Sequence, residues 1–152
     1  MGTVEFNSAC YYRYAVVDWE QLVKNLQGDT ELAMRGLRTF LQGFVVAEPT
    51  GKQNTFAAHN PPEFVAITVC RNAAPRNYAN AFETAIRAKT GESLTRKSAD
   101  ALCAKANDLQ TAYPRDSQTF VLDLTKTELG GCGEAVKSLG VMLDKTLAAV
   151  QE

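Results

Sequence analysis

EFNSACYYRYAVVD, residues 5–18, is the stretch with the strongest preference for one kind of secondary structure. Its aromatic and β-branched residues alternate between two faces, and neither Pro nor Gly interrupts it. Because such a row suits a pleated, largely buried surface, we expect a central β-strand over residues 5–18. A central strand needs a neighbour on each edge, and only four residues precede this one. Later strands flank it, or the chain starts in the middle of a larger fold.

The remaining pattern alternates further strands with helices. Alternating apolar residues predict strands over 63–71 and 118–125, and helical periodicity predicts helices over 19–27, 77–89 and 95–111. A longer amphipathic helix follows Asp29 and a last helix ends near Val150, while Asp18 and Asp29 are the expected N-caps. The order indicates an α+β fold in one domain, with an antiparallel sheet and helices packed mainly on one face.

Bulk composition is typical of a soluble globular protein. The 152 residues are 45% hydrophobic and 22% charged, which fits one domain with a real core. No apolar run approaches the roughly 20 residues of a membrane helix, and the polar N-terminus does not resemble a signal peptide. We therefore expect a cytoplasmic protein without membrane partners.

The formal net charge of −1 argues against a general electrostatic grip on nucleic acid. It leaves room for a local basic surface, because residues 71–97 hold six cations against two acids. A solvated helix face with its connecting loops is the favoured interpretation of those cations, which are Arg71, Arg76, Arg87, Lys89, Arg96 and Lys97.

Residues that carry catalytic chemistry are sparse. The four cysteines are widely spaced and include no Cys-x-x-Cys pair, so we expect reduced, mostly buried thiols, no metal and no cofactor. His59 with Cys10 or Cys70 would suggest a thiol hydrolase, but a lone His beside two prolines is more often structural. The GGCG run at 130–133 could hold an anion before a helix, although a flexible hinge is favoured. We therefore expect that the protein is not an enzyme.

Three motifs in order resemble one family. They are GTVEF at 2–6 followed by YYRY at 11–14, KQNTFAAHNP at 52–61, and ANAFE at 79–83. Together they are similar to the CasC backbone subunit of the type I-E CRISPR Cascade, over roughly residues 2–86. The resemblance implies a partial RNA-recognition-motif-like (ferredoxin-like) palm. Copies of the family's protein stack along the guide RNA (crRNA) and hold its sugar-phosphate chain without reading its sequence.

The resemblance also implies partners and boundaries. Expected partners are guide RNA, further copies of the chain and other Cascade subunits, with target DNA contacted only indirectly and cleaved by another protein. Since the family's chain is more than twice as long, residues 1–152 look like the C-terminal half of a palm-fingers-thumb subunit, with Met1 as an internal start. An exposed sheet edge, beside 5–18 or 63–71, would then favour pairing between copies.

Few residues inherit an RNA-binding role from the family. Thr3 lies at the base of the matching thumb, and Lys52 and Gln53 offer a charge and an amide to phosphate. A solvated turn is the alternative for Lys52 and Gln53, and packing is favoured over base stacking for Tyr11, Tyr12 and Tyr14. The alternative function is a protein–protein interaction module that assembles with itself or with Cascade subunits and binds no RNA.

Overall fold

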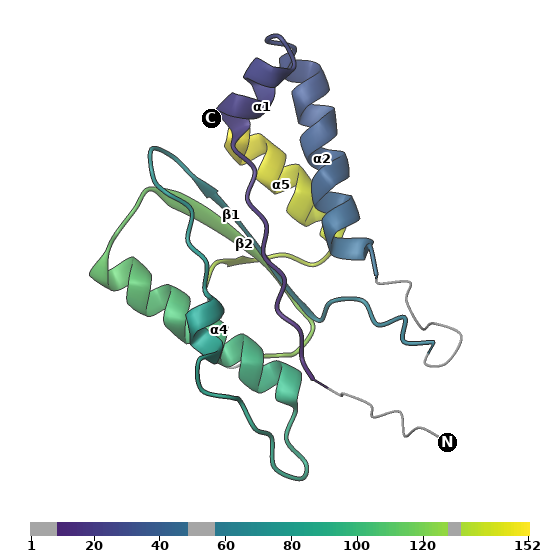
Figure 1. Cartoon of the computed structure of the whole chain (residues 1–152), viewed down its shortest axis with the longest axis vertical. Coiled ribbons are helices and arrows are strands. Elements are labelled where there is room, and N and C mark those ends of the chain that lie inside the picture. Colours follow the sequence, from purple (N-terminus) through teal and green to yellow (C-terminus); the bar gives the residue numbers. More distant parts are fainter. Residues whose placement is uncertain (1–8, 49–56, 128–131) are drawn as a thin grey trace, which may run out of the picture.

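The chain forms an α+β fold, as the sequence predicts. The computed structural model describes residues 9–48, 57–127 and 132–152 (Figure 1). Along the chain these residues form α1 (Trp19–Asn25), α2 (Thr30–Val46), β1 (Phe64–Cys70), the 3₁₀ helix η1 (Ala79–Phe82), α4 (Leu94–Ala112), β2 (Ser117–Asp123), β3 (Glu134–Ala135) and α5 (Leu139–Gln151). No helix in these ranges is long and apolar enough to cross a membrane.

The described sheet has three strands in the order β1-β2-β3. β1 and β2 are antiparallel, with Phe64 opposite Asp123 and Cys70 opposite Ser117, which confirms the strands expected over 63–71 and 118–125. β3 pairs with β2 in parallel, through Glu134 and Ala135. The sheet is therefore mixed, and the expectation of a wholly antiparallel sheet was wrong at β3.

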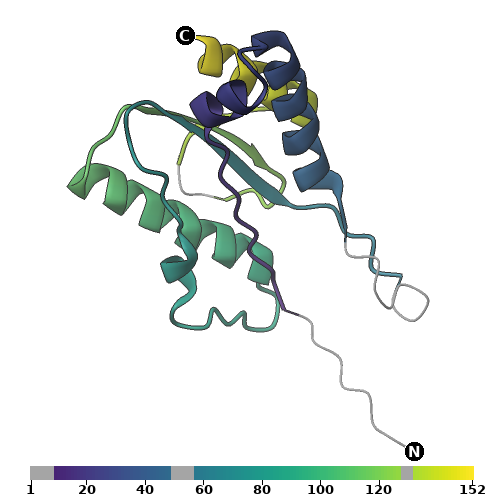
Figure 2. The ribbon, with the colours of Figure 1, turned by 45° about the horizontal axis from the view of Figure 1, so that its top comes forward.

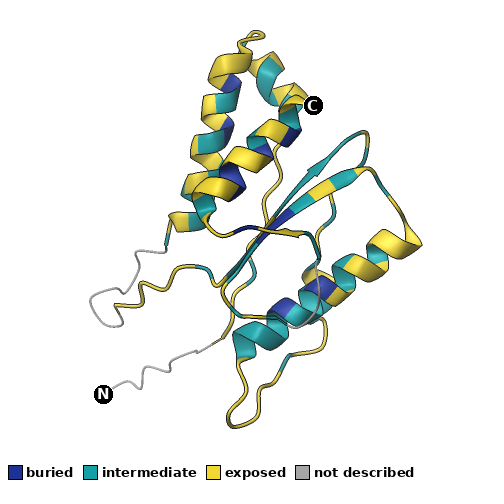
Figure 3. Cartoon of the chain, turned by 180° about the vertical axis from the view of Figure 1, so that it is seen from behind, coloured by how far each residue is buried: buried dark blue, intermediate teal, exposed yellow. Residues whose placement is uncertain are grey.

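Helices cover both faces of the sheet. α5 packs on one face with α2 behind it, while α4 and η1 lie on the other side (Figure 2). The core under α5 contains Phe120, Val136, Met142 and Ala149, and buried positions on α4 mark the second layer (Figure 3). The expected one-sided packing was wrong because both faces of β1 and β2 are apolar enough to be covered.

Local capping follows the sequence closely. The Asp18 Oδ1 accepts a hydrogen bond from the Gln21 N–H at 2.9 Å, and Asp29 Oδ1 accepts one from the Leu32 N–H at 2.8 Å. Both predicted N-caps are confirmed, and each satisfies an amide that the helix itself leaves unpaired. Ser93 and Ser138 cap α4 and α5 in the same way.

Residues 9–18 do not form the expected strand. They are irregular, and no described strand pairs with them, while residues 5–8 lie outside the described residues. Tyr12 is bonded to Asn77 and Arg13 to Ala47 instead. The sequence of residues 9–18 favours a β-strand, but no described strand forms hydrogen bonds with it, so the segment stays irregular.

The helix expected over 77–89 is reduced to the four residues of η1. The Asn77 Oδ1 accepts from the Ala79 N–H at 2.9 Å, the Tyr12 hydroxyl accepts from the Tyr78 N–H at 3.2 Å, and the Glu92 Oε2 accepts from the Lys89 N–H at 2.6 Å. Side-chain oxygens of Tyr12, Asn77 and Glu92 thus fix the backbone on both sides of η1, and the periodic pattern does not extend into an α-helix.

The cysteines also differ from expectation. Cys103, buried on α4, and Cys132, just before β3, form a disulfide across 29 residues of sequence. Cys10 is exposed and Cys70 is half-buried. The prediction of four reduced, mostly buried thiols was wrong, because spacing along the chain does not reveal which cysteines meet in space.

Candidate nucleic-acid interface

The predicted RNA-binding residues Thr3, Lys52 and Gln53 lie outside the described residues. The chain on both sides of residues 49–56 is described. The start of the described 9–18 segment lies on the same side of the molecule as these flanks (Figure 1). This side is the candidate interface.

Arg13 fixes a positive charge beside the end of α2. Its Nη1 donates to the Ala47 carbonyl at 2.9 Å, and its guanidinium lies 4.5 Å from the centroid of the Phe44 ring. Ala47 is the C-cap of α2, immediately before Glu48 and the segment with Lys52. Because a guanidinium has five N–H donors, this contact leaves donors for phosphate. Sequence reasoning missed Arg13, although its place in the YYRY run was a usable signal.

His59 joins the two flanks of residues 49–56. Its Nδ1 lies 3.1 Å from the Glu48 Oε2, and the His59 N–H donates to the Ala57 carbonyl at 3.0 Å. Ala57 has φ 46°, a left-handed conformation that is uncommon outside Gly and marks a tight turn. The ring contacts a carboxylate among the described residues, and not a cysteine. This geometry agrees with a structural His59 and offers no thiolate–imidazole pair.

The three tyrosines divide into different roles. The Tyr12 ring packs 5.5 Å from the Phe82 centroid, its hydroxyl donates to Asn77 Oδ1 at 3.2 Å, and burial raises its pKa. Tyr12 therefore packs, as favoured from the sequence. Tyr11 is 76% exposed and Tyr14 39% exposed. The Tyr11 side chain is therefore largely exposed.

Two of the arginines in the basic stretch hold helix ends. Arg71 Nη2 donates to the Ala149 carbonyl of α5 at 2.9 Å, and Arg76 Nη1 donates to the Leu109 carbonyl of α4 at 3.1 Å. Arg115 adds a bond to the Ala74 carbonyl at 3.0 Å. Cations at helix C-termini are favourable because the negative end of the helix dipole lies there, and the Leu109 carbonyl accepts from the Tyr113 N–H at 3.0 Å as well. Arg71 and Arg76 are thus structural contacts, and not members of a solvated helix face.

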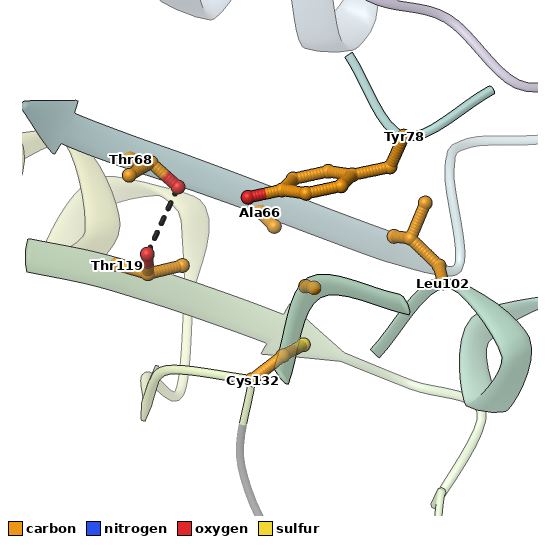
Figure 4. Close-up of a pocket in the computed structure, with 7 residues that line it drawn as sticks. Ala66, Thr68, Tyr78, Leu102, Thr119 and Cys132 are labelled. Carbon is orange, nitrogen blue, oxygen red and sulfur yellow. Dashed lines mark hydrogen bonds between the residues drawn. The ribbon is translucent and has the colours of Figure 1, made fainter. Parts of the chain in front are cut away.

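A small cavity lies between the sheet and α4 (Figure 4). It has a volume of about 30 Å³ and is lined by Ala66, Thr68, Tyr78, Leu102, Ala106, Thr119 and Cys132. The Thr68 and Thr119 hydroxyls meet at 2.9 Å across β1 and β2. This volume suits about one water molecule, so the cavity cannot hold a nucleotide. No group of three or more His, Cys, Asp or Glu side chains in the described chain could hold a metal.

The GGCG run at 130–133, for which anion binding was the less favoured alternative, does not lead directly into the last helix. Gly130 and Gly131 lie outside the described residues, Cys132 is in the disulfide, and β3 separates this run from the α5 N-cap Ser138. A Cβ on Gly133 would lie 2.6 Å from the Thr119 carbonyl oxygen, so this glycine permits close approach of β3 to β2. Gly133 lies immediately before β3 and packs closely against β2, and the favoured hinge interpretation stays a prediction.

Comparison with solved structures defines the class of protein. The fold matches a chain of a "CRISPR RNA-guided surveillance complex" with TM-score 0.79 and 32% identity, over 88% of this chain and 50% of that one. It also matches a chain of a "CRISPR RNA-guided surveillance complex, pre-nicking" with TM-score 0.76 and 32% identity, over 88% of this chain and 35% of that one. The chain thus spans half or less of these relatives.

The family is shown by the sequence itself. A family model described as CT1975-like protein matches residues 1–148. The chain belongs to the CT1975-like protein family. Comparison with curated proteins finds no match.

Proposed function

We propose that this chain is a non-catalytic scaffold unit of a CRISPR RNA-guided surveillance complex that binds guide RNA through its backbone. The observation that carries the proposal is the structural match of 88% of the chain to a subunit of such a complex, at 32% identity. The family match over residues 1–148 supports it independently of the coordinates. A scaffold role needs no catalytic group.

In this proposal a few residues bind the RNA backbone, and no extended basic surface is needed. Arg13 is held at the end of α2 beside the stretch that carries Lys52 and Gln53, and Thr3 is the fourth contact. Donors of this kind bind phosphate and read no base identity. A local grip is consistent with the net charge of −1, because a few contacts suffice when many copies line one RNA.

The finer features of the proposal come from the three sequence motifs. They favour a type I-E Cascade, a partial RNA-recognition-motif-like palm, and a relation to the C-terminal part of a palm-fingers-thumb subunit. In this account copies stack into a helical filament in the cytoplasm beside other Cascade subunits, and target DNA is met only through the guide.

Fluorescence anisotropy of a labelled single-stranded RNA tests the local grip. Lys52→Ala is compared with Lys137→Ala, which removes the same charge from an exposed position beyond β3. We expect Lys52→Ala to weaken binding and to lower the slope of log affinity against log salt by about 0.7, the value for one phosphate contact on a single strand. Equal effects of the two variants would remove Lys52 from the site.

A second candidate function is an interaction module that contacts only proteins. The observation in its favour is exposed apolar surface: Val16 is 50% exposed, Val17 36% and Phe40 44%. If RNA does not bind at low salt while the chain still joins a surveillance complex, this function replaces the first.

A further inference from the structure

The Cys103–Cys132 disulfide connects α4 to the start of β3. Cys103 is a buried residue of α4, and Cys132 lies two positions before the first residue of β3. β3 is only two residues long and pairs with β2 through Glu134 and Ala135. Because so short a ladder holds a strand weakly, the disulfide is an important restraint on the position of β3.

The other contacts around β3 are few and mostly exposed. The Val136 N–H donates to the Val121 carbonyl at 2.8 Å, and the Val136 side chain enters the core under α5. Glu134 Oε1 lies 2.6 Å from Lys145 Nζ, but the two side chains are 50% and 44% exposed, so this ion pair contributes little. The Val136 amide therefore reports directly on whether β3 stays in place.

The fold has room for both oxidation states of the two cysteines. The cavity of about 30 Å³ between the sheet and α4 is lined in part by Cys132 (Figure 4). Two thiols lie at van der Waals distance, farther apart than two bonded sulfurs, and this cavity offers the extra space. The residues one turn from Cys103 on the same face of α4 are Ala99 and Ala106, and a reduced cysteine packs among such neighbours as a small apolar side chain.

We propose that Cys103 and Cys132 form a redox switch, which a dithiol opens and the corresponding disulfide closes, and which sets how firmly β3 is held. Attack begins at Cys132, because its side chain is half-buried whereas Cys103 is 2% exposed. A thiolate of the dithiol bonds to the Cys132 Sγ, and Cys103 leaves as a thiolate that takes up a proton.

The second thiol of the dithiol completes the exchange. It displaces the Cys132 sulfur, which also takes up a proton. The dithiol thereby loses two electrons and two protons and becomes a disulfide, while the protein gains two thiols. The same exchange in reverse closes the switch, so no other oxidant is required.

The first test counts thiols in the whole folded protein. The protein is equilibrated without denaturant in oxidised or reduced dithiothreitol, quenched in acid, unfolded and alkylated, and its mass is measured. We expect two alkylated cysteines after oxidation, Cys10 and Cys70, and all four after reduction. Cys10→Ser should lower both counts by one, because its exposed thiol takes no part in the exchange.

The second test asks whether the switch acts on β3 in particular. Amide hydrogen exchange by NMR compares Val136 with Leu37, a buried residue in the middle of α2. A change in global stability alone alters both rates by the same factor, so the ratio of the two rates isolates local release of β3. We expect reduction to raise this ratio about tenfold or more. Cys132→Ala should show the raised ratio with and without dithiothreitol.

Three results overturn the proposal. The first is four alkylated cysteines after oxidation of the folded protein. The second is a pair that dithiothreitol reduces only when denaturant is present, which would make the bond purely structural. The third is an unchanged ratio of the Val136 and Leu37 rates on reduction. None of these measurements involves RNA, so this proposal and the proposed function can fail independently.

Discussion

Asp123 closes the end of β2 with four hydrogen bonds. Its Oδ1 accepts from the Thr125 N–H at 2.7 Å and hydroxyl at 2.6 Å, and its Oδ2 accepts from the Thr127 N–H at 3.0 Å and hydroxyl at 2.8 Å. Burial raises the pKa of Asp123, but these four bonds outweigh burial and the net pKa is lowered. The bonds stabilise the carboxylate form, so this turn depends on its charge.

The first prediction concerns acid stability. Because the folded pKa of Asp123 lies below the unfolded value, its contribution is fully present above the unfolded pKa, near 4, and is lost as pH falls through the folded pKa. We expect Asp123→Asn to lower the free energy of unfolding at pH 7 by about 1–3 kcal/mol. Urea unfolding between pH 2 and 7 should show a smaller acid-dependent loss in the variant. An identical pH profile in both proteins would contradict this role.

A second prediction at this scale concerns Gly133. Alanine there would place Cβ 2.6 Å from the Thr119 carbonyl oxygen, which belongs to the backbone of β2 and cannot move aside easily. We expect Gly133→Ala to destabilise the fold by about 1–3 kcal/mol. Gly140→Ala in α5 is the control, since a Cβ there would lie 4.0 Å from the Ser138 Oγ and alanine favours helix. Thermal unfolding of both variants measures the contrast.

Residues with local roles were predictable, and residues with distant partners were not. Asp18 and Asp29 cap helices within three positions, so the sequence was sufficient to place them. The position of Gly133 depends on Thr119, which is distant in sequence. Arg13 was missed as a site residue because its partners, Ala47 and Phe44, are more than 30 residues away.

Helices and strands also divide into those that local sequence determines and those that depend on distant contacts. α2 and α4 were predicted because apolar periodicity and a capping residue act together within each helix, and β1 and β2 because each has a long apolar run. The strand expected at 5–18 and the helix at 77–89 had equally clear patterns. They were wrong because no described strand pairs with residues 9–18, and because the Tyr78 N–H bonds the Tyr12 hydroxyl, 66 residues away, which no local pattern encodes.

A prediction at the element scale concerns the C-terminus of α4. Arg76 donates to the Leu109 carbonyl at 3.1 Å and also bonds the Tyr113 carbonyl, both in the last turn or just beyond it. We expect Arg76→Ala to cost about 1–3 kcal/mol, the range for hydrogen bonds from a charged group. Hydrogen exchange should accelerate at the end of α4 first. Arg87→Ala, an exposed arginine in the same stretch, should leave both quantities nearly unchanged.

The whole molecule combines a small core with exposed apolar side chains. The described core comprises ten apolar residues and Thr146, while large apolar side chains such as Val16, Val46 and Leu124 are at least half exposed. The chain covers 50% of one solved relative and 35% of another. Exposed apolar surface of this kind marks contact sites for other molecules.

The central claim is sequence-independent binding of the guide RNA backbone. Its most direct test is the affinity of the protein for two single-stranded RNAs of unrelated sequence, measured by anisotropy across a range of salt. The two charged phosphate contacts, from Arg13 and Lys52, set the salt dependence and predict a slope of log affinity against log salt of about −1.4, with equal affinities for the two RNAs. Absence of binding at low salt, or affinities that differ more than about tenfold between the two RNAs, would contradict the claim.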